Sequence, residues 1–357
     1  MVKSAGPKKQ KDQKPHKPWW KKLLFFLAWF VGVIITLGVI IWIAFQVSPW
    51  PSALLLRSAF EQNAQEQVAI MNKYVPASGI DANYNISYRN NDKDAKMDVF
   101  TTADAAKADK ALPTVIWVHG GGWISGSKES VAPYLKIMAS RGYTTIGLDY
   151  SIAPEKQYPT PIIQVTEALK YINEHAAELN VDKNQIVLAG DSAGSQIAAQ
   201  VATIITNPQY AKLMNMTPPI QASQLSAMLL SCGAYDLSLA NANDGSEGAQ
   251  LIETFLWAYS GYKDFSKDTA IYPASVVEHV NKDFPPSFIT AGNKDPLLQQ
   301  SEVMAAKLKS LGVTTDTLFY PPNYTPELQH EYQFNLDISA GQNALNDILS
   351  FLKQHTH

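Results

Sequence analysis

Cysteine is almost absent from this sequence, since Cys232 is the single thiol in 357 residues. One cysteine cannot form an intramolecular disulfide, and it cannot supply the several thiolates of a cysteine-based zinc site. The patterns of phosphate-binding loops, G-x-x-x-x-G-K-[ST] and G-x-G-x-x-G, are also missing from the glycine-rich segment near residue 120. These absences exclude a disulfide framework and argue against phosphate binding at that segment.

Basic residues are concentrated at the N-terminus. Residues 1–22 contain eight lysines and one acid, Asp12, which gives a balance of +7 in a chain whose net charge is −3. The remaining residues therefore carry −10. Because nucleic-acid binding depends mainly on basic surface, we expect no nucleic-acid partner for this acidic body.

Charged residues are missing from an apolar run of 23 residues at positions 23–45. As a helix this run would be roughly 34 Å long, which is enough to cross a bilayer. Lys21 and Lys22 abut one side of it only. We therefore predict a disordered basic cytoplasmic tail at residues 1–22, a single transmembrane helix in the lipid bilayer at 23–45, and an extracytoplasmic body. A cleavable signal peptide is the alternative, although its apolar region is usually shorter.

The rest of the chain predicts a mixed helix and strand architecture. An amphipathic pattern indicates a helical linker or cap element at 46–83, with one or two helices ending before Pro76. From residue 84 to 357, short apolar runs alternate with helical stretches, which is typical of a mostly parallel sheet flanked by helices. The expected strands are 97–101, 114–118, 144–148, 185–189, 227–231, 287–291 and 315–319, and the expected helices are 133–140, 162–179, 195–205, 301–311 and 340–353. Residues 236–282 break this rhythm and predict a helical cap insertion.

A glycine-flanked serine follows the predicted strand at 185–189. In Gly190-Asp-Ser192-Ala-Gly194 the serine lies between a strand and a helix, where a sharp turn lifts a hydroxyl clear of the sheet. The flanking glycines leave room for the two backbones to approach each other. Since this spacing also arises by chance in Gly-rich turns, the motif predicts Ser192 as a nucleophile only together with further signals.

The further signal is the string His119-Gly-Gly-Gly-Trp123, which follows the predicted strand at 114–118 and is much rarer by chance. Residues without side chains let backbone N–H groups approach a ligand, and acyl transfer needs such donors where negative oxygen develops. We predict that the N–H groups of Gly121, Gly122 and Ala193 form an oxyanion hole.

Together with Asp149-Tyr-Ser-Ile-Ala-Pro-Glu155, the two glycine motifs resemble the hormone-sensitive-lipase-like branch of the α/β-hydrolases. The resemblance covers roughly residue 84 to the C-terminus and implies an α/β-hydrolase fold and a serine esterase. That branch usually has Arg-Leu where this chain has Ser151-Ile152, and a further glycine where it has Ser195. We expect different packing near these loops and no change in a catalytic atom.

A serine hydroxyl needs an imidazole to take its proton, and the imidazole needs a carboxylate to fix its tautomer and stabilise its charge. The resemblance implies His330, in a Pro-containing loop after the last strand, as the general base. It implies Asp295, just after the strand at 287–291, as the acid, although this residue could instead cap the next helix. Asp236 is the competing acid, and His279 precedes the favoured acid in the chain.

Other polar and aromatic residues of the motifs have less specific interpretations. Trp123 and Tyr150 are candidates for the wall of an acyl pocket, although aromatic residues in such loops are equally often packing residues. We interpret Asp149, Glu155 and Asp191 as scaffold residues that position the loops. The serine mechanism requires no metal and no cofactor.

The predicted function is a membrane-anchored serine carboxylesterase that cleaves short- to medium-chain acyl esters through Ser192, His330 and Asp295. One alternative keeps these residues and assigns them to a deacetylase of cell-envelope polysaccharide or to an amidase. Another is a hydrolase-fold protein that binds partners without catalysis, because fold does not fix function. The expected partner is a small ester substrate, and the sequence does not indicate the oligomeric state.

Overall fold

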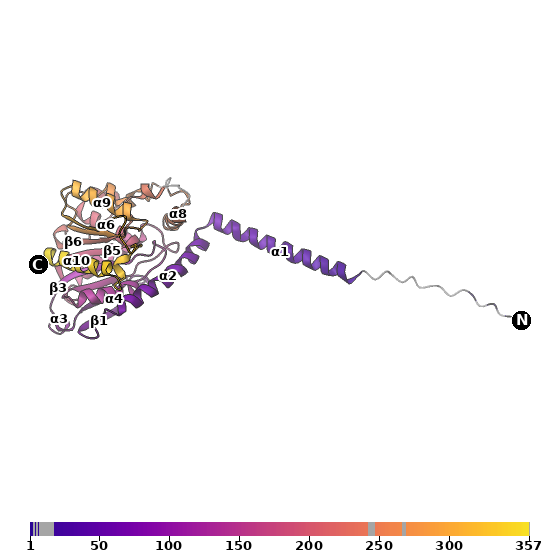
Figure 1. Cartoon of the computed structure of the whole chain (residues 1–357), viewed down its shortest axis with the longest axis horizontal. Coiled ribbons are helices and arrows are strands. Elements are labelled where there is room, and N and C mark those ends of the chain that lie inside the picture. Colours follow the sequence, from indigo (N-terminus) through magenta and orange to yellow (C-terminus); the bar gives the residue numbers. More distant parts are fainter. Residues whose placement is uncertain (3, 5, 7–17, 242–246, 266–268, 357) are drawn as a thin grey trace. The chain divides into compact units, whose positions relative to one another are not determined.

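The computed structural model describes residues 1, 2, 4, 6, 18–241, 247–265 and 269–356 (Figure 1). The chain divides into two compact units, residues 1–48 and 49–357. The first contains α1 (Trp19–Val47), which begins four residues before the predicted apolar run. Residues 19–22, predicted as part of a disordered tail, are therefore helical. Most of that predicted tail lies outside the described residues.

Helix α1 has no buried residue, and its long apolar side chains are exposed. Among the described helices it is the one that is long and apolar enough to cross a membrane. A signal sequence near an N-terminus meets the same criterion of length and composition. The helix is therefore compatible with a membrane span and with a signal sequence.

The second unit is built on an eight-stranded sheet with the order β1-β2-β4-β3-β5-β6-β7-β8 in the described part of the chain. Strands β1 and β2 are antiparallel to their neighbours, whereas β3 to β8 pair in parallel. The strands are β1 (Ile80–Ser87), β2 (Lys96–Thr102), β3 (Leu112–Val118), β4 (Thr144–Leu148), β5 (Val181–Asp191), β6 (Leu225–Ser231), β7 (Ser287–Ala291) and β8 (Thr315–Phe319). This mostly parallel sheet confirms the predicted fold class.

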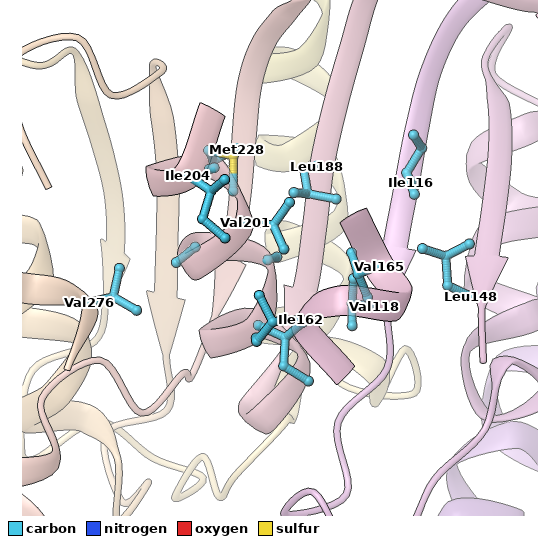
Figure 2. Packing of buried hydrophobic residues seen from close by; sticks show 14 of the residues in the cluster. Ile116, Val118, Leu148, Ile162, Val165, Leu188, Val201, Ile204, Met228 and Val276 are labelled. Atoms are coloured by element: carbon cyan, nitrogen blue, oxygen red, sulfur yellow. The ribbon is translucent and has the colours of Figure 1, made fainter. Parts of the chain in front are cut away.

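Helices cover both faces of the sheet, because successive side chains of each buried strand point to opposite faces. The helices of the second unit are α2 (Trp50–Asn72), α3 (Ala103–Lys107), α4 (Lys128–Ala139), α5 (Thr160–Glu174), α6 (Ser192–Thr206), α7 (Pro208–Leu213), α8 (Glu247–Ser260), α9 (Leu298–Ser310) and α10 (Ser339–His355). On one face Ile116 and Leu188 pack with apolar residues of α5 and α6, as Figure 2 shows. On the other, Trp117 packs with residues of α4 and α10, for example Ile348.

The observed elements differ from the predicted ones in two ways. Strand β1 was not predicted, because its sequence is polar and it lies at the sheet edge with most side chains exposed. Several helices also begin earlier than predicted: α4 begins at Lys128 with Pro133 inside it, and α6 begins at Ser192 itself. Short 3-10 helices add η1 (Ala222–Gln224), η2 (Leu237–Asn241), η4 (Tyr272–Ala274), η5 (Val276–Glu278) and η6 (Tyr332–Phe334).

Two helices outside the sheet layers lie together near its carboxyl-terminal edge. Helix α2 is a single helix where the sequence predicted one or two, and it packs against α4 and α8. Helix α8 belongs to the segment between β6 and β7, where the cap insertion was predicted. The Phe60 ring of α2 lies 5.6 Å from the Phe255 ring of α8. Ala53 and Met71 fix the two ends of α2 in the hydrophobic core, where both are fully buried.

Candidate active site

Ser192 lies at the junction of β5 and α6 and has a backbone φ of +50°. A positive φ is costly for a residue with a side chain and is typical of functional turns. The flanking glycines are required sterically: a Cβ on Gly194 would lie 2.1 Å from the carbonyl oxygen of Val118, and one on Gly190 would lie 2.5 Å from the Gly194 carbonyl carbon. The sequence therefore folds here into a tight turn that presents the Ser192 hydroxyl.

The structure brings Ser192, His330 and Asp295 together. The Oγ of Ser192 lies 2.9 Å from Nε2 of His330, and Nδ1 of His330 lies 2.9 Å from both carboxylate oxygens of Asp295. All three side chains come from loops at the carboxyl ends of strands, although Ser192 and His330 are 138 residues apart. In this geometry an imidazole can accept the hydroxyl proton while a carboxylate holds its other nitrogen.

Two loops are tied together to place the acid beside the imidazole. A Cβ on Gly292 would lie 2.2 Å from the carbonyl oxygen of Leu328, so only glycine fits between the loops. The N–H of Lys294 donates to that carbonyl at 3.0 Å, and the N–H of Leu328 donates to the side-chain oxygen of Asn293 at 2.8 Å. These contacts fix the loop after β7 against the loop that carries His330.

The electrostatics of the site favour a charged His330. Burial lowers the pKa of this imidazole, but the neighbouring Cys232 and the Asp295 carboxylate raise it, and the net pKa lies well above the ordinary value. Burial raises the pKa of the Cys232 thiol to about 11. Since that thiol is protonated at neutral pH, the Asp295 carboxylate is the charge that stabilises the imidazolium there.

Cys232, Asp295 and His330 also offer potential metal-ligating atoms within 4.8 Å of one another. A metal would need the thiolate, whereas the raised pKa keeps this sulfur protonated. The carboxylate and Nδ1 already bind each other. The three residues therefore fit a proton-transfer site better than a metal site.

The glycine loop after β3 has the backbone of a donor site. Gly121 and Gly122 have φ values of +106° and +59°, and a Cβ on Gly121 would lie 2.3 Å from the Ser125 carbonyl oxygen. Neither N–H donates to an acceptor in the described part of the protein. The N–H of Ala193, in the first turn of α6, also lacks an intrahelical acceptor by its position. Three donors near the Ser192 hydroxyl are thus available to a ligand.

A cavity of about 800 Å³ contains these groups. Its floor includes Ser192, His330 and the glycine loop, and its sides include Phe60 of α2 and Phe255 of α8. Most of the remaining wall is apolar, with Val68, Val131, Leu237, Leu251, Ile252, Leu256, Leu297 and Phe334. The arrangement can hold an uncharged, partly apolar molecule with a carbonyl group beside the serine hydroxyl.

A family model described as alpha/beta hydrolase fold matches residues 115–325, which is more than half of the chain. This chain belongs to the alpha/beta-hydrolase family. Among curated relatives of this hydrolase, a carboxylesterase of Mycobacterium tuberculosis is 30% identical over 258 residues, covering 69% of this chain and 75% of that protein. A protein of Acanthamoeba polyphaga mimivirus named as an alpha/beta hydrolase is 27% identical over 215 residues, and the match spans 58% of each chain.

Solved structures share the fold of this hydrolase. Esterase B from Lactobacillus Rhamnosis superposes with a TM-score of 0.70 at 20% identity, covering 86% of this chain and 96% of that one. A bacterial heroin esterase superposes with a TM-score of 0.65 at 21% identity, covering 84% of this chain and 91% of that one. At this level of identity the likeness establishes the fold, and the site must be judged from its own residues.

The two aromatic residues predicted for the pocket wall have different positions in the hydrolase. Trp123 lines the cavity, stacks on Tyr259 with ring centroids 4.8 Å apart, and donates to Gln196 at 3.2 Å. Tyr150 is absent from the wall, so that part of the prediction is wrong. Its ring stacks on His119, and its hydroxyl donates to the His119 carbonyl at 2.9 Å, which supports the glycine loop from behind.

The predicted scaffold residues make the contacts of a scaffold. Asp149 accepts from the backbone N–H of Lys128 at 2.7 Å, and burial raises its pKa to about 6. Glu155 accepts two hydrogen bonds, both 2.7 Å, from the guanidinium of Arg57 on α2. Asp191 is buried and is described further below. None of these three carboxylates bonds to His330.

The rival acid and histidine lie outside the constellation. The Asp236 carboxylate accepts from the N–H and hydroxyl of Ser238, so it caps its own turn. His279 packs against Tyr210, with ring centroids 4.7 Å apart, and burial lowers its pKa. Sequence reasoning missed Glu331, a cavity residue at φ +59° whose carboxylate faces Asp191 and His330. Its position next to His330 in the sequence was the available signal.

Proposed function

We propose that this protein is a membrane-anchored serine carboxylesterase, with Ser192 as nucleophile, His330 as general base and Asp295 as the residue that orients His330. The observation that carries the proposal is the unbroken chain of 2.9 Å contacts from the Ser192 hydroxyl through His330 to Asp295. A cavity of about 800 Å³ opens onto the same hydroxyl. The same constellation recurs on unrelated hydrolase folds, where it is recognised by its geometry and by the roles of its residues.

The chain is a carboxylic ester hydrolase, because it belongs to the alpha/beta-hydrolase family and matches curated proteins named carboxylesterase and esterase. The roles of individual residues, the membrane anchor and the acyl length are our proposal. The geometry described above supports the residue roles independently of the relatives.

In the first step Ser192 Oγ attacks the ester carbonyl carbon while its proton passes to Nε2 of His330. The carbonyl oxygen gains negative charge, which the N–H groups of Gly121, Gly122 and Ala193 stabilise. The imidazolium then gives its proton to the leaving alkoxide, so an alcohol departs and an acyl-serine remains. Water repeats the sequence with His330 as base, and the acid leaves.

The cavity supports a substrate of limited size and no negative charge. Its lining contains no lysine or arginine among the described residues, whereas Glu61, Glu129, Asp191 and Glu331 line it. An anionic substrate would meet like charge in a partly desolvated site. The apolar wall and the enclosed volume support esters of short to medium acyl chains.

Helix α1 supports the anchor. Its run at 23–45 has no charge, and none of its residues is buried. Lys21 and Lys22 precede the run, which supports a cytoplasmic N-terminus and an extracytoplasmic catalytic unit. Carbonate extraction of membranes tests the anchor, with residues 49–357 as the matched soluble form. Release of the full-length chain by carbonate would contradict it.

Labelling with a fluorophosphonate probe tests the serine. We expect one label per chain in the wild type and none in Ser192→Ala, whose hydroxyl is missing. A panel of p-nitrophenyl esters of increasing acyl length then tests the substrate, alongside an acetylated polysaccharide and an anilide. Faster turnover of either of the last two would favour the deacetylase or amidase. A wild-type chain that neither reacts with the probe nor turns over any panel member would remove the enzyme proposal.

A further inference from the structure

A second carboxyl group, Glu331, lies beside the proposed catalytic histidine. Its side chain is 19% exposed, and Oε1 lies 3.9 Å from Nε2 of His330. The residue has a φ of +59°, a conformation that residues other than glycine, asparagine, aspartate and histidine rarely adopt. The Glu331 carboxylate lies close to three other elements of the structure. An unfavourable backbone conformation at such a position indicates that the carboxylate has a positioning role.

The first of these elements is the segment just before the nucleophile. A Cβ placed on Gly120 would lie 2.2 Å from Oδ2 of Asp191 and 2.9 Å from Oε1 of Glu331, so the two carboxyl groups are close neighbours. Asp191 is buried, and it accepts from Nε1 of Trp117 at 2.6 Å and from the N–H of Gly120 at 2.8 Å. Two carboxylates this close in a buried site cannot both ionise without a large cost.

The second element is the glycine loop, and the third is α2. The Asp191 carboxylate holds the N–H of Gly120, which directly precedes the proposed donors Gly121 and Gly122. On the other side, Nε2 of Gln67 on α2 donates to Oε2 of Glu331 at 3.4 Å. The carboxyl pair therefore joins the histidine loop, the glycine loop and one wall of the cavity.

We propose that Glu331 is a positioning residue that shares one proton with Asp191 and through it holds the Gly120–Gly122 loop in the geometry that stabilises the oxyanion. This inference rests on the proposed esterase function. The shared proton replaces repulsion between the carboxyl groups with a hydrogen bond. Burial, and next the charge of Glu331, raise the pKa of Asp191 well above its ordinary value, in agreement with a retained proton.

The other titratable groups that face the carboxyl pair do not offset its negative charge in place of the shared proton. Burial raises the pKa of Tyr150 far above its ordinary value and that of Cys232 to about 11, so both are neutral. His330 is the one cation-forming group that we find facing the pair among the described residues, and its Nδ1 is engaged by Asp295. A single negative charge on the pair also favours the imidazolium that forms during acyl transfer.

Infrared difference spectroscopy of the full-length protein between pH 5 and pH 10 tests the shared proton without turnover. We expect the C=O band of a protonated carboxylic acid to persist at neutral pH in the wild type and to be lost in both Asp191→Asn and Glu331→Gln. The matched control is Glu129→Gln, which removes a cavity carboxylate that Lys128 binds instead, and it should keep the band. A band that survives both pair variants, or that is absent from the wild type at neutral pH, overturns the proposal.

Steady-state kinetics test the positioning role. Glu331→Ala should lower kcat about tenfold and change KM little, because a displaced oxyanion donor acts on the transition state. Glu331→Gln should recover most of that loss, since an amide N–H can replace the shared proton. The wild type should lose activity as the infrared band disappears at alkaline pH, and Glu331→Gln should not. An unchanged kcat in Glu331→Ala would refute the positioning role, and so would a loss of activity at alkaline pH that persists in Glu331→Gln.

The esterase function and the shared proton can fail separately. If the wild type hydrolyses no ester and does not react with the fluorophosphonate probe, the esterase function fails, while the infrared band still decides whether the proton is shared. If the wild type is active and the band is absent, the carboxyl pair fails alone. Circular dichroism of each variant identifies any that does not fold, and the isosteric amide variants then decide the question.

Discussion

Gly292 and Leu328 lie so close that a methyl group on Gly292 would be 2.2 Å from the Leu328 carbonyl oxygen. The contact joins the loop that carries Asp295 to the loop that carries His330. The approach of these two backbones, together with the hydrogen bond from Lys294 to Leu328, sets the distance between carboxylate and imidazole. Gly292, three residues before Asp295 in the chain, thus controls the placement of the proposed acid and base.

Gly292→Ala should therefore separate the two loops and lower kcat/KM by at least about tenfold, since misplacement of a catalytic group by 1 Å can cost 10²-fold. The control is Gly312→Ala, which strains a φ of +78° in open space before the amino end of β8, whereas the two loops follow the carboxyl ends of β7 and β8. Both variants should lose some thermal stability, measured by circular dichroism. Equal kcat/KM in the two, assayed well below either Tm, would disprove the special role of Gly292.

Asp295→Asn should leave the fold intact and reduce kcat by about 10³-fold or more. An amide can hold His330 in the wrong tautomer, and it has no charge to stabilise the imidazolium. The matched control is Asp236→Asn, which removes the carboxylate of the rival acid and should keep kcat within about twofold. Single-turnover kinetics with a chromogenic ester would measure both. A larger loss in Asp236→Asn than in Asp295→Asn would reverse our assignment.

The pH dependence follows from the state of His330, which must be neutral to accept the serine proton. Its pKa is lowered by burial but raised more by Cys232 and the Asp295 carboxylate, to well above the ordinary value of 6.5. A raised pKa keeps the imidazolium to higher pH, so kcat/KM should rise with pH through a midpoint above 6.5. Asp295→Asn should move that midpoint down, and an upward move would contradict the cause we name.

Arg57 joins α2 to the catalytic unit through one side chain. Its guanidinium donates to both oxygens of Glu155 at 2.7 Å and to the carbonyl oxygens of Ile124 and Ala153 at 2.6 and 2.9 Å. Arg57→Ala should lower the free energy of unfolding by about 1–3 kcal/mol, since two buried carbonyl groups lose their donors. Arg57→Lys should recover only part of this, because an ammonium lacks the planar fork. Urea denaturation measures the free energy of unfolding of both variants. An unchanged value in Arg57→Ala would show that α2 docks without this residue.

Much of the fold could be predicted from the sequence because its strands are buried on both faces. Seven predicted strands correspond to β2 through β8, each an apolar run between helical patterns. Strand β1 has no such run, because Asp81, Asn83 and Asn85 interrupt it. It forms a strand through its antiparallel pairing with β2. The start of α4 was predicted too late because Ser127 caps the helix six residues before Pro133, and this proline lies inside the helix.

The proposed catalytic residues could be identified because each lies in a short local motif after a strand. The contact between Glu331 and Gln67 could not be predicted, since it joins positions 264 residues apart and depends on where α2 docks. Tyr150 was wrongly predicted to lie in the pocket wall for a related reason. An aromatic ring in a loop can face either the cavity or the core, and only the position of the His119 ring decides between them.

Helix α2 carries a further implication for how this protein can change over time. Part of the cavity wall is encoded before β1, in the stretch that directly follows α1, and another part is encoded in the insertion that holds α8. A recombination event that replaced the leading segment with that of another family member would therefore exchange α1 and one part of the cavity wall together. Changes in the apolar helix and changes in the substrate cavity thus arise in adjoining codons.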